Sequence, residues 1–535
     1  MKEITAKLTN SKFGPKIQLK FPYDPELISK IKSLSWDETH RRWDKENKCW
    51  ELDATSEVVE LLKKIGISLD QEIINQIEEL EKIKIILEGN RGYIKGKLDE
   101  QLIQLIDDEL SFQPEGYEWT KAYQEGRWDG YIRLFNKRDR SFPVGLLSYV
   151  EKILKEGEKE YKIIDKRKEG EPIKLEWYGL PLREYQKEAI KVMKKHTSGL
   201  ISMPTGTGKT ILFLKYVQEM GKSTVIFVHR KELLYQWRDR FIKYLGIEPG
   251  IVGDNHYDER QFTIAMLQTV NRKPLKRKYD IMCIDEAHHT PADTFYRISQ
   301  MVKSKYRFGL SATPWRQDGK DMLIWAGTGP IIYNVNVEDM VRQGFLAKPE
   351  FITLDYGGYI PGKDWREVQR NLIENRKRNQ AIINFVEDKY KKGYRIYVDV
   401  LRVKHGKLLE EKLLERGVNA IFLSGKDLTE KRKDVLKRFE EIGDFVLIST
   451  LIKEGVDLPK MNMILLAGGG KSGIRTIQTI GRALRPKKGE NKAYIIDLRD
   501  EGKYVEDHYL KRQEIMKKYY KSLYKNNVPS KIRYI

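Results

Sequence analysis

The chain has 535 residues, of which 40% are hydrophobic and 33% are charged, with a formal net charge of +21. This composition excludes a disordered chain, and the length predicts three or four domains of about 150 residues each. No segment approaches the roughly 18 apolar residues of a membrane span. Because the first ten residues lack the apolar core of a signal peptide, we expect a cytoplasmic location, in the nucleoid or in a host cytoplasm.

The first 165 residues consist of short aromatic and charged segments without a phosphate loop. A strand over KIQLKF, a helix over LISKIKSL and a hairpin with Asn47 and Lys48 near its tip predict a small α+β domain over residues 1–75. A strand over RGYIKGKL and helices over DEQLIQLIDDEL and LLSYVEKILKE predict a second small α+β domain over residues 76–165.

Apolar runs alternate with helical patterns from about residue 180 to residue 500. Runs such as TVIFV, YDIMCI and MILLAG predict buried strands of parallel sheets. We therefore expect an α/β fold with two parallel-sheet domains, over residues 166–345 and 346–500, divided near Phe345. Residues 501–535 are expected to form a basic helical tail, because nine Lys or Arg residues face three acidic ones after Gly502.

The two cysteines, Cys49 and Cys283, cannot form a disulfide framework in so long a chain, and no CxxC pair offers zinc-ligand spacing. A reducing compartment is the simplest interpretation. The charge of +21 and the isoelectric point near 9.4 favour a polyanionic partner, because Lys and Arg residues that neutralise phosphates release condensed counterions. Nucleic acid is the expected partner; general solubility in a Lys-rich proteome is the alternative.

A glycine-rich turn follows the strand-like run LISM and precedes the helical run ILFLKYVQEM. Its residues are Pro204, Thr205, Gly206, Thr207, Gly208, Lys209 and Thr210. Backbone N–H groups of such a turn point at phosphate oxygens, and the following helix adds its positive dipole end. Lys209 is then expected to meet the β and γ phosphates, and the hydroxyl of Thr210 is expected to bind magnesium. The first position of the motif is Met203, where the general pattern has glycine.

An acidic pair, Asp285 and Glu286, follows the apolar strand YDIMCI about 75 residues downstream. At the end of a strand, one carboxylate can hold the magnesium shell while the next orients the attacking water. We assign Asp285 to the metal and Glu286 to the water. A solvated loop is the alternative for an isolated acidic pair, and pairing with the phosphate loop argues against it. The adjacent His288 and His289 do not form a zinc site, because further ligands are missing nearby.

The order of these motifs resembles that of superfamily 2 helicases, in which the box Asp-Glu-Ala-His names one branch. The resemblance implies two RecA-like motor domains that use ATP and Mg²⁺. It also implies that Ser311, Ala312 and Thr313 couple the nucleotide state to domain motion, together with His288 and Gln478. Arg183 and Gln186 resemble the adenine-reading motif, and Gly455 and Asp457 belong to a segment that resembles motif V.

Two arginines, Arg482 and Arg485, belong to a segment that resembles motif VI, QTIGRALR. Their spacing of three residues places them on one face of a helix. A guanidinium that crosses the domain cleft would neutralise charge developing on the γ phosphoryl group, an effect worth roughly 10³ to 10⁵ in rate for arginine fingers. Arg485 is the first candidate, with Arg482 beside it; a surface helix with ordinary salt bridges is the alternative.

Groups that grip a DNA backbone are expected at the ends of strands in both domains, because hydroxyls, amides and short basic segments hold phosphates without reading bases. His229 and Arg230, followed by Gln236 and Trp237, resemble motif Ia. The remaining candidates that the resemblance implies are Gln268, Thr269, Ser424 and Thr450. Each of them could instead be a helix cap or part of a turn.

Within the superfamily, the segments FGLSATPWRQDG and GRALRPKKG resemble the group of UvsW and XPB-like helicases. Residues 128–146 resemble the small domain before the motor in that group, and the first 70 residues faintly resemble the HARP-type module of annealing helicases. These likenesses imply DNA binding and substrate recognition. We expect backbone contacts from Lys121, Arg127, Arg133, Lys137 and Arg138. We expect at least three of the five tryptophans Trp36, Trp43, Trp50, Trp119 and Trp128 to be core residues; a platform on which unpaired bases stack is the alternative.

The leading hypothesis is an ATP-dependent DNA helicase or translocase that acts on branched or damaged DNA in repair, recombination or replication. The resemblance alone implies a 3′ to 5′ direction. We expect a monomer with no membrane association and with Arg127, Trp128 and Arg133 on DNA. One alternative is an RNA helicase, which would depend on 2′-hydroxyls. Another is a nucleotide-gated translocating subunit of a restriction or defence complex, which would need a partner for cleavage because the chain shows no convincing nuclease motif.

Overall fold

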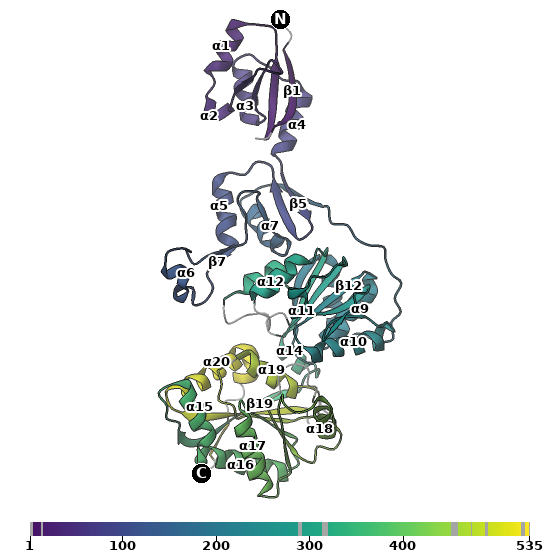
Figure 1. Cartoon of the computed structure of the whole chain (residues 1–535), viewed down its shortest axis with the longest axis vertical. Coiled ribbons are helices and arrows are strands. Elements are labelled where there is room, and N and C mark those ends of the chain that lie inside the picture. The colour runs from purple at the N-terminus through teal and green to yellow at the C-terminus, as the bar shows by residue number, and fades with distance from the viewer. Residues whose placement is uncertain are drawn as a thin grey trace. The chain divides into compact units, whose positions relative to one another are not determined.

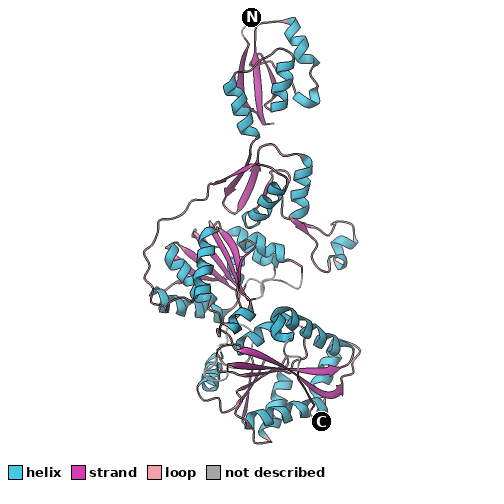
Figure 2. Ribbon diagram, turned by 180° about the vertical axis from the view of Figure 1, so that it is seen from behind, coloured by secondary structure: helices cyan, strands magenta, loops and turns pink. Residues whose placement is uncertain are grey.

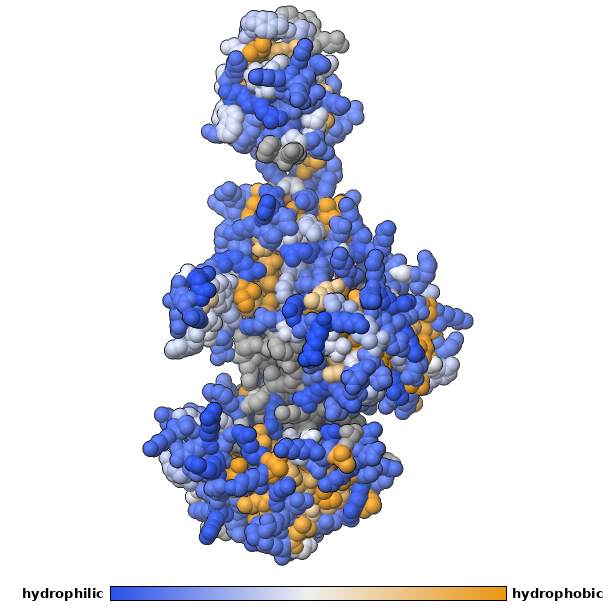
Figure 3. All heavy atoms as spheres, viewed as in Figure 1, coloured by the Kyte–Doolittle hydropathy of each residue, from blue (hydrophilic) through white to orange (hydrophobic). Residues whose placement is uncertain are grey.

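The computed structural model describes residues 4–11, 14–286, 292–312, 319–450, 458, 460–471, 473–486, 491–525 and 530–533. The chain forms two compact units, residues 1–168 and residues 169–535 (Figure 1). Among the described residues, no helix is long and apolar enough to cross a membrane. The side of the molecule drawn in Figure 3 is mainly hydrophilic, with hydrophobic residues scattered over it.

The first unit begins with an antiparallel sheet in the order β1-β2-β4-β3. Its hairpin turns at Lys48, whose φ of 49° lies in the left-handed region. Aliphatic side chains such as Ile17, Leu52 and Leu62 form the core between this sheet and its helices. The elements are β1 Thr5–Ser11, β2 Gly14–Lys20, α1 Pro25–Ser33, α2 Trp36–Thr39, β3 Arg42–Asp44, β4 Cys49–Asp53, α3 Ser56–Lys64 and α4 Gln71–Glu81.

A second sheet completes this unit, in the order β10-β5-β6-β9. Strands β10 and β5 are parallel, and the other pairs are antiparallel. A short pair, β7 with β8, carries the segment that contains η1 and α6. The elements are β5 Ile83–Glu88, β6 Arg91–Lys95, α5 Glu100–Glu109, β7 Ser111–Phe112, η1 Tyr117–Trp119, α6 Lys121–Gln124, β8 Ile132–Arg133, β9 Ser141–Pro143, η2 Val144–Leu146, α7 Leu147–Glu156 and β10 Tyr161–Asp165.

The expectation that tryptophans fill these small cores is wrong. Only Trp50 of the five is buried, at 8% exposure, whereas Trp119 is 82% exposed, Trp36 58% and Trp43 44%. Trp128 is half-buried. Branched aliphatic residues fill the first core, and aliphatic residues with Phe135 and Phe142 fill the second, so neither core needs the tryptophans.

The second unit contains two α/β domains with helices on both sides of their sheets (Figure 2). The first has the strand order β14-β13-β15-β12-β16-β17-β11-β18, parallel except for the β13–β14 pair. Its strands are β11 Ser198–Ser202, β12 Thr224–Val228, β13 Gly250–Gly253, β14 His256–Tyr257, β15 Phe262–Met266, β16 Ile281–Asp285, β17 Tyr306–Ser311 and β18 Ile331–Asn334. Its helices are α8 Glu184–Lys195, α9 Lys209–Met220, α10 Lys231–Leu245, α11 Leu267–Arg272, α12 Ala292–Met301, α13 Asp321–Thr328 and α14 Val337–Arg342.

The second α/β domain has a fully parallel sheet in the order β21-β22-β20-β23-β24-β19-β25. The two expected parallel sheets are thus confirmed. The strands are β19 Lys348–Tyr359, β20 Ile396–Asp399, β21 Ala420–Leu423, β22 Val446–Ser449, β23 Met463–Leu466, β24 Lys492–Glu501 and β25 Ser530–Arg533. The helices are α15 Trp365–Glu374, α16 Arg376–Lys391, α17 Val403–Leu414, α18 Thr429–Glu441, α19 Gly473–Ala483 and α20 Lys503–Lys525.

Candidate nucleotide site and nucleic-acid surface

The glycine-rich turn lies between β11 and α9, as the sequence predicts. Gly206 and Gly208 adopt φ values of 86° and 84°, a region that favours glycine. A Cβ atom on Gly208 would lie 2.6 Å from Nε2 of Gln186, so the side chain packed there also requires glycine. The hydroxyl of Thr207 donates to the carbonyl oxygen of Pro204 at 2.7 Å. The turn is therefore held in shape by its own side chains, next to the first turn of α9.

Gln186 and Tyr185 of α8 brace this turn from outside. The Gln186 amide donates to the carbonyl oxygen of Thr207 at 3.0 Å, and its oxygen accepts from the backbone of Arg183 at 3.0 Å. The Tyr185 hydroxyl donates to the same carbonyl at 2.8 Å. The Arg183 guanidinium lies 4.5 Å from the centre of the Phe345 ring. The structure shows Gln186 as a support of the phosphate loop, and adenine contact by Gln186 and Arg183 stays a prediction.

The acidic pair stands at the carboxyl end of β16, beside the turn. The indole of Trp237, which is 1% exposed, donates to Oδ2 of Asp285 at 2.8 Å. Glu286 has a φ of 51°, and its backbone N–H donates to Leu310 at 2.9 Å. Oε1 of Glu286 lies 3.8 Å from the Lys209 ammonium, which also donates to the carbonyl oxygen of Met203 at 3.0 Å. The two carboxylates thus face the start of α9, Glu286 in a conformation that costs backbone energy.

Buried Asp285 lies among cationic and polar groups. Burial raises the pKa of this carboxyl group, and the hydrogen bond from Trp237 and the charges of Lys209 and Arg240 oppose that rise. Arg240 of α10 also donates to the Thr210 hydroxyl at 2.6 Å. The cation of Arg240 therefore lies near both groups predicted to bind magnesium. Carboxylate and hydroxyl oxygens are ligands that suit this hard ion, so the donor set fits it.

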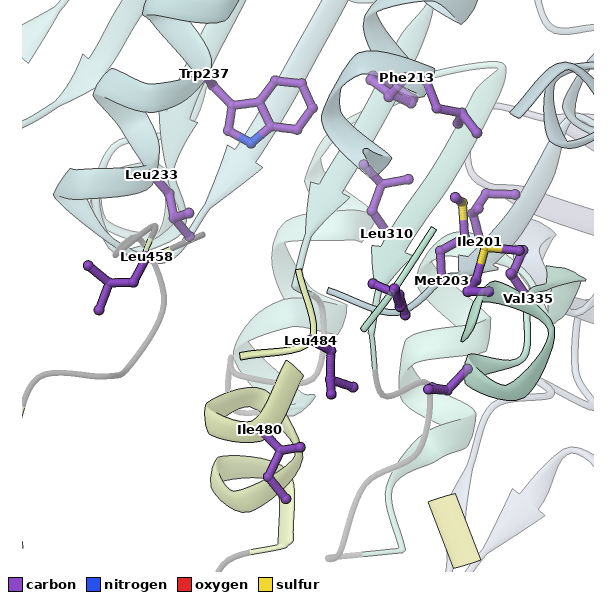
Figure 4. Close-up of a cluster of buried hydrophobic side chains, with 14 of the residues drawn as sticks. Ile201, Met203, Phe213, Leu233, Trp237, Leu310, Val335, Leu458, Ile480 and Leu484 are labelled. Carbon is purple, nitrogen blue, oxygen red and sulfur yellow. The ribbon is translucent and has the colours of Figure 1, made fainter. Parts of the chain in front are cut away.

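A cavity of about 540 Å³ contains these groups and three side chains of the second domain, Gln478, Arg482 and Arg485. A Cβ atom on Gly206 would lie 3.6 Å from Cγ of Arg485, and one on Gly481 would lie 3.1 Å from Cβ of Thr205. Figure 4 shows a cluster of buried hydrophobic side chains from both domains, of which Leu233 also lines the cavity. Its labelled members include Met203, Leu310, Ile480 and Leu484.

One expectation for the arginines is corrected. Helix α19 ends at Ala483, so only Arg482 lies on the helix and Arg485 lies in the turn after it. The unbroken motif QTIGRALR predicted a longer helix. Pro486 makes the helix end earlier, because a residue before a proline disfavours helical geometry. Both side chains still line the cavity.

The coupling motif lies next to the phosphate loop at the end of β17. The backbone N–H of Met203 donates to Ser311 at 2.9 Å, and the Tyr519 hydroxyl donates to Ala312 at 3.1 Å. Predicted residues His288, Thr313, Gly455 and Asp457 lie outside the part of the chain that the structure describes.

The candidate backbone-gripping residues of the first domain lie together. His229 and Arg230 follow β12, and Gln268 and Thr269 begin α11 after β15, the neighbouring strand. The amide of Gln268 donates to the carbonyl oxygen of His229 at 3.0 Å. Trp237 does not belong to this surface as expected, because it is buried against Asp285.

In the second domain, Ser424 and Thr450 follow the adjacent strands β21 and β22. The hydroxyl of Ser424 donates to Asp427 at 2.9 Å and is buried, which is the arrangement of a turn cap. The backbone N–H of Thr450 donates to Leu423 at 3.4 Å. The structure places both at one edge of the sheet, and phosphate contact by either stays a prediction.

The candidate cations of the first unit are paired with acids. Arg127 forms an ion pair with Glu125, and Arg133 pairs with Asp129. The indole of Trp128 donates to the carbonyl oxygen of Tyr131 at 2.8 Å. These pairs are exposed and therefore weak, so they do not prevent phosphate contact.

Sequence reasoning missed two groups of the cavity, Gln236 and Arg240, and the true place of Trp237. All three lie on α10, within about one turn of each other. The resemblance to motif Ia placed Gln236 and Trp237 with the DNA-binding candidates, and no motif marks Arg240. Leu233, Trp237 and Arg240 are nevertheless spaced as one helix face that has to meet a neighbour.

The two parallel sheets, the strand–loop–helix turn and the acidic pair define a phosphate-loop ATPase with two RecA-like domains. Family models match along the chain: "DNA helicase UvsW, N-terminal" at residues 84–165, "Type III restriction enzyme, res subunit" at 179–316, and "Helicase conserved C-terminal domain" at 367–487. The chain belongs to the superfamily 2 helicases, in the UvsW and XPB-like group, and is an ATP-dependent enzyme of that family.

Three similar proteins illustrate this relationship. The DNA 3'-5' translocase XPB2 of Sulfurisphaera tokodaii is 27% identical, over 64% of this chain and 87% of its own length. Helicase 161L of invertebrate iridescent virus 6 is 30% identical, over 62% of this chain and 79% of its own. The DNA-bound restriction-modification enzyme LlaBIII shares the fold, with a TM-score of 0.51 and 14% identity over 70% of this chain and 34% of its own. The chain spans less than two thirds of two further curated relatives, 64% and 59%.

Proposed function

We propose that the chain is an ATP-driven DNA helicase or translocase that acts on branched DNA. The observation that carries the proposal is the cavity in which the phosphate loop, the acidic pair and two arginines of the other domain meet. In such a site, groups of both domains can contact the γ phosphate, so its loss can move one domain relative to the other. The names of the relatives XPB2 and UvsW support DNA as the substrate, and the name of XPB2 supports 3′ to 5′ as the direction.

Each group of the cavity has a role that its position supports. Lys209 would neutralise the β and γ phosphates from the start of α9. Thr210 and Asp285 would hold a magnesium ion, which supplies further neutralisation of phosphate charge. Glu286 would orient the attacking water, and Arg482 and Arg485 would stabilise charge on the transferred group.

The nucleic acid would lie across the carboxyl edges of the two parallel sheets. The candidates at these edges, where they could hold phosphates, are His229, Arg230, Gln268 and Thr269 on the first domain and Ser424 and Thr450 on the second. Arg482 and Arg485 would link the second domain to the nucleotide. Hydrolysis would therefore change the distance between the two sheet edges that hold the DNA phosphates. The first unit, residues 1–168, would direct the motor to forks or junctions.

The test is ATP hydrolysis by the whole chain and by a shortened chain that begins at Lys166, each with single-stranded, duplex, forked and four-way DNA and with matched RNA. We expect branched DNA to stimulate the whole chain most, and the shortened chain to lose that preference. Greater stimulation by RNA would instead make the protein an RNA helicase. Stimulation by duplex without strand separation would indicate a translocating subunit of a larger complex.

A further inference from the structure

A second cavity, of about 450 Å³, lies in the second α/β domain and shares no described lining residue with the nucleotide cavity. It opens where β20 and β23 end, under helices α15 and α20, which pack against each other (Figure 1). The loop Gly468-Gly469-Gly470-Lys471 after β23 forms one wall, and this cavity is called the glycine-loop pocket. None of the sequence motifs pointed to it.

The glycine loop is held by its neighbours. A Cβ atom on Gly468 would lie 2.9 Å from Leu401, and one on Gly469 would lie 2.6 Å from Leu372. Gly469 also has a φ of 67°. From α20, His508 Nδ1 donates to the carbonyl oxygen of Gly469 at 3.1 Å, and Arg512 donates to that of Gly470 at 2.8 Å. The conformation of the loop is therefore fixed by its neighbours, and its lack of side chains keeps the pocket open.

Positive charge and aromatic surface meet in this pocket. Lys471 is exposed and makes no ion pair with any described residue. Arg475 also lines the pocket and donates to Asp399, the one acidic residue among the described lining, at 2.6 Å. Trp365 and Tyr504 add aromatic rings, with the Trp365 ring 4.3 Å from that of His508. Both rings are half-buried and pack against a small hydrophobic cluster. A cation beside the remaining open aromatic surface suits a nucleotide, which offers a phosphate and a base.

The strand order places the pocket in line with the proposed path of DNA. Strands β21, β22, β20 and β23 are adjacent in that order and parallel, so their carboxyl ends share one edge. Ser424 and Thr450 follow the first two strands, and the pocket follows the next two. Neighbouring strands lie about 4.8 Å apart, so β22 and β23 are about 10 Å apart, which is about three nucleotides at ~3.4 Å each.

We propose that the glycine-loop pocket binds one nucleotide of the strand that the motor follows, with its base against Trp365 and its phosphate beside Lys471. The inference rests on the proposed function, and it adds a third contact beyond Ser424 and Thr450. The contact does not depend on base identity, because stacking and phosphate pairing are available to every nucleotide.

The test measures binding of a fluorescein-labelled single-stranded DNA by anisotropy, over a range of salt concentrations, with the whole chain. Trp365→Leu should raise the Kd about fivefold or more, the loss expected from about one stacking contact, while Trp365→Phe should bind within about twofold of the wild type. Lys471→Ala should lower the salt dependence, log Kd against log salt, by about 0.7. The matched control is Lys404→Ala, a lysine of the same domain that pairs with Glu374 outside the pocket.

A second measurement identifies the occupant and guards against a folding defect in Trp365→Leu. Single-stranded DNA that carries 5-iodouracil should crosslink on irradiation to a peptide containing Trp365 or Tyr504 in the wild-type protein. Competition with inorganic phosphate and with deoxythymidine monophosphate should be weak, and strong competition by either would make the pocket a small-molecule site and overturn the inference. Crosslinks only elsewhere, with wild-type binding by Trp365→Leu and Lys471→Ala, would also overturn it.

The two proposals fail in different ways. If DNA does not stimulate ATP hydrolysis by the wild-type chain, the proposed function fails. If DNA stimulates hydrolysis normally but the pocket variants bind like the wild type, only the glycine-loop pocket is refuted.

Discussion

The hydroxyl of Tyr519 donates a hydrogen bond of 3.1 Å to the carbonyl oxygen of Ala312. This bond joins α20, which packs on the second sheet, to the coupling motif of the first domain. Burial and the nearby charge of Glu286 both raise the pKa of Tyr519, so the hydroxyl stays protonated and donates. A second bond follows the kink at Lys521, where φ is 42°: the backbone N–H of Ser522 donates to Glu338 of α14 at 2.5 Å. Helix α20 therefore packs on the second sheet and also contacts the first domain, at the coupling motif and at α14.

Tyr519→Phe should weaken the coupling of hydrolysis to movement. The ring stays in place, while the one bond to Ala312 is lost; a hydrogen bond is worth about 0.5–1.5 kcal/mol, so we expect about two- to tenfold less DNA unwound per ATP hydrolysed. The measurement is the ratio of unwinding rate to hydrolysis rate on a forked DNA. Tyr524→Phe is the matched control, because the Tyr524 hydroxyl bonds Gln513 within α20. An equal loss in both variants would mean that only helix packing matters.

Glu286→Gln should bind ATP but hydrolyse it at least about 10²-fold more slowly, because the amide cannot accept a proton from the attacking water. The backbone bond from Glu286 to Leu310 is kept in this variant. Steady-state hydrolysis and binding of a fluorescent ATP analogue measure the two effects separately. Glu184→Gln, at an exposed carboxylate paired with Lys187, is the control. Normal turnover by Glu286→Gln would remove Glu286 from its assigned role.

The fold and the centre of the site could be predicted because the residues predicted to bind and hydrolyse ATP lie at the ends of strands. The phosphate loop and the acidic pair each follow a continuous apolar strand, and the parallel order brings those ends together. The rest depended on side-chain packing. From the middle of a helix, Arg240 reaches the cavity and Trp237 reaches the carboxylate of Asp285, and nothing in their local sequence tells burial from exposure.

The prediction that the N-terminal tryptophans are core residues was wrong for the same reason. Aromatic content predicts cores on average, yet in this chain aliphatic side chains fill the small sheets and leave Trp119 and Trp36 in solvent. The glycine-loop pocket was missed because its residues come from α15, β20, β23 and α20, which only the folded chain joins.

Arg482 and Arg485 should each support ATP hydrolysis in a way that lysine cannot replace. Arg485→Ala should lower kcat by roughly 10³ or more with little change in KM for ATP, since the contact is made to charge that develops during transfer. Arg485→Lys should not restore the rate, because an ammonium lacks the planar fork of donors. Arg482→Ala should show a loss of the same order if both arginines act together, and a wild-type rate would leave Arg485 alone in the role. The control for charge removal is Arg416→Ala, because Arg416 pairs with Glu387 and neither residue lines the nucleotide cavity.

His405 of α17 should make the second domain less stable below pH 6.5. Burial, with the charge of Arg378, lowers the pKa of this imidazole from 6.5 to about 3, and Nε2 lies 3.0 Å from Oδ1 of Asn379. The native state therefore resists protonation, while the unfolded chain takes up a proton below pH 6.5. Stability is fully kept above that pH and is lost progressively as the pH falls towards 3.

Between pH 7 and pH 5 this difference corresponds to about 2 kcal/mol of unfolding free energy. His405→Gln, which can still donate to Asn379, should remove that dependence. Hydrogen exchange of the α16 and α17 amides, corrected for intrinsic rates, measures the local free energy of opening in the whole chain. His196→Gln, at an exposed histidine whose ring bonds Val192, is the control. Equal pH dependence in the wild type and in His405→Gln would show that His405 does not set the acid stability of this domain.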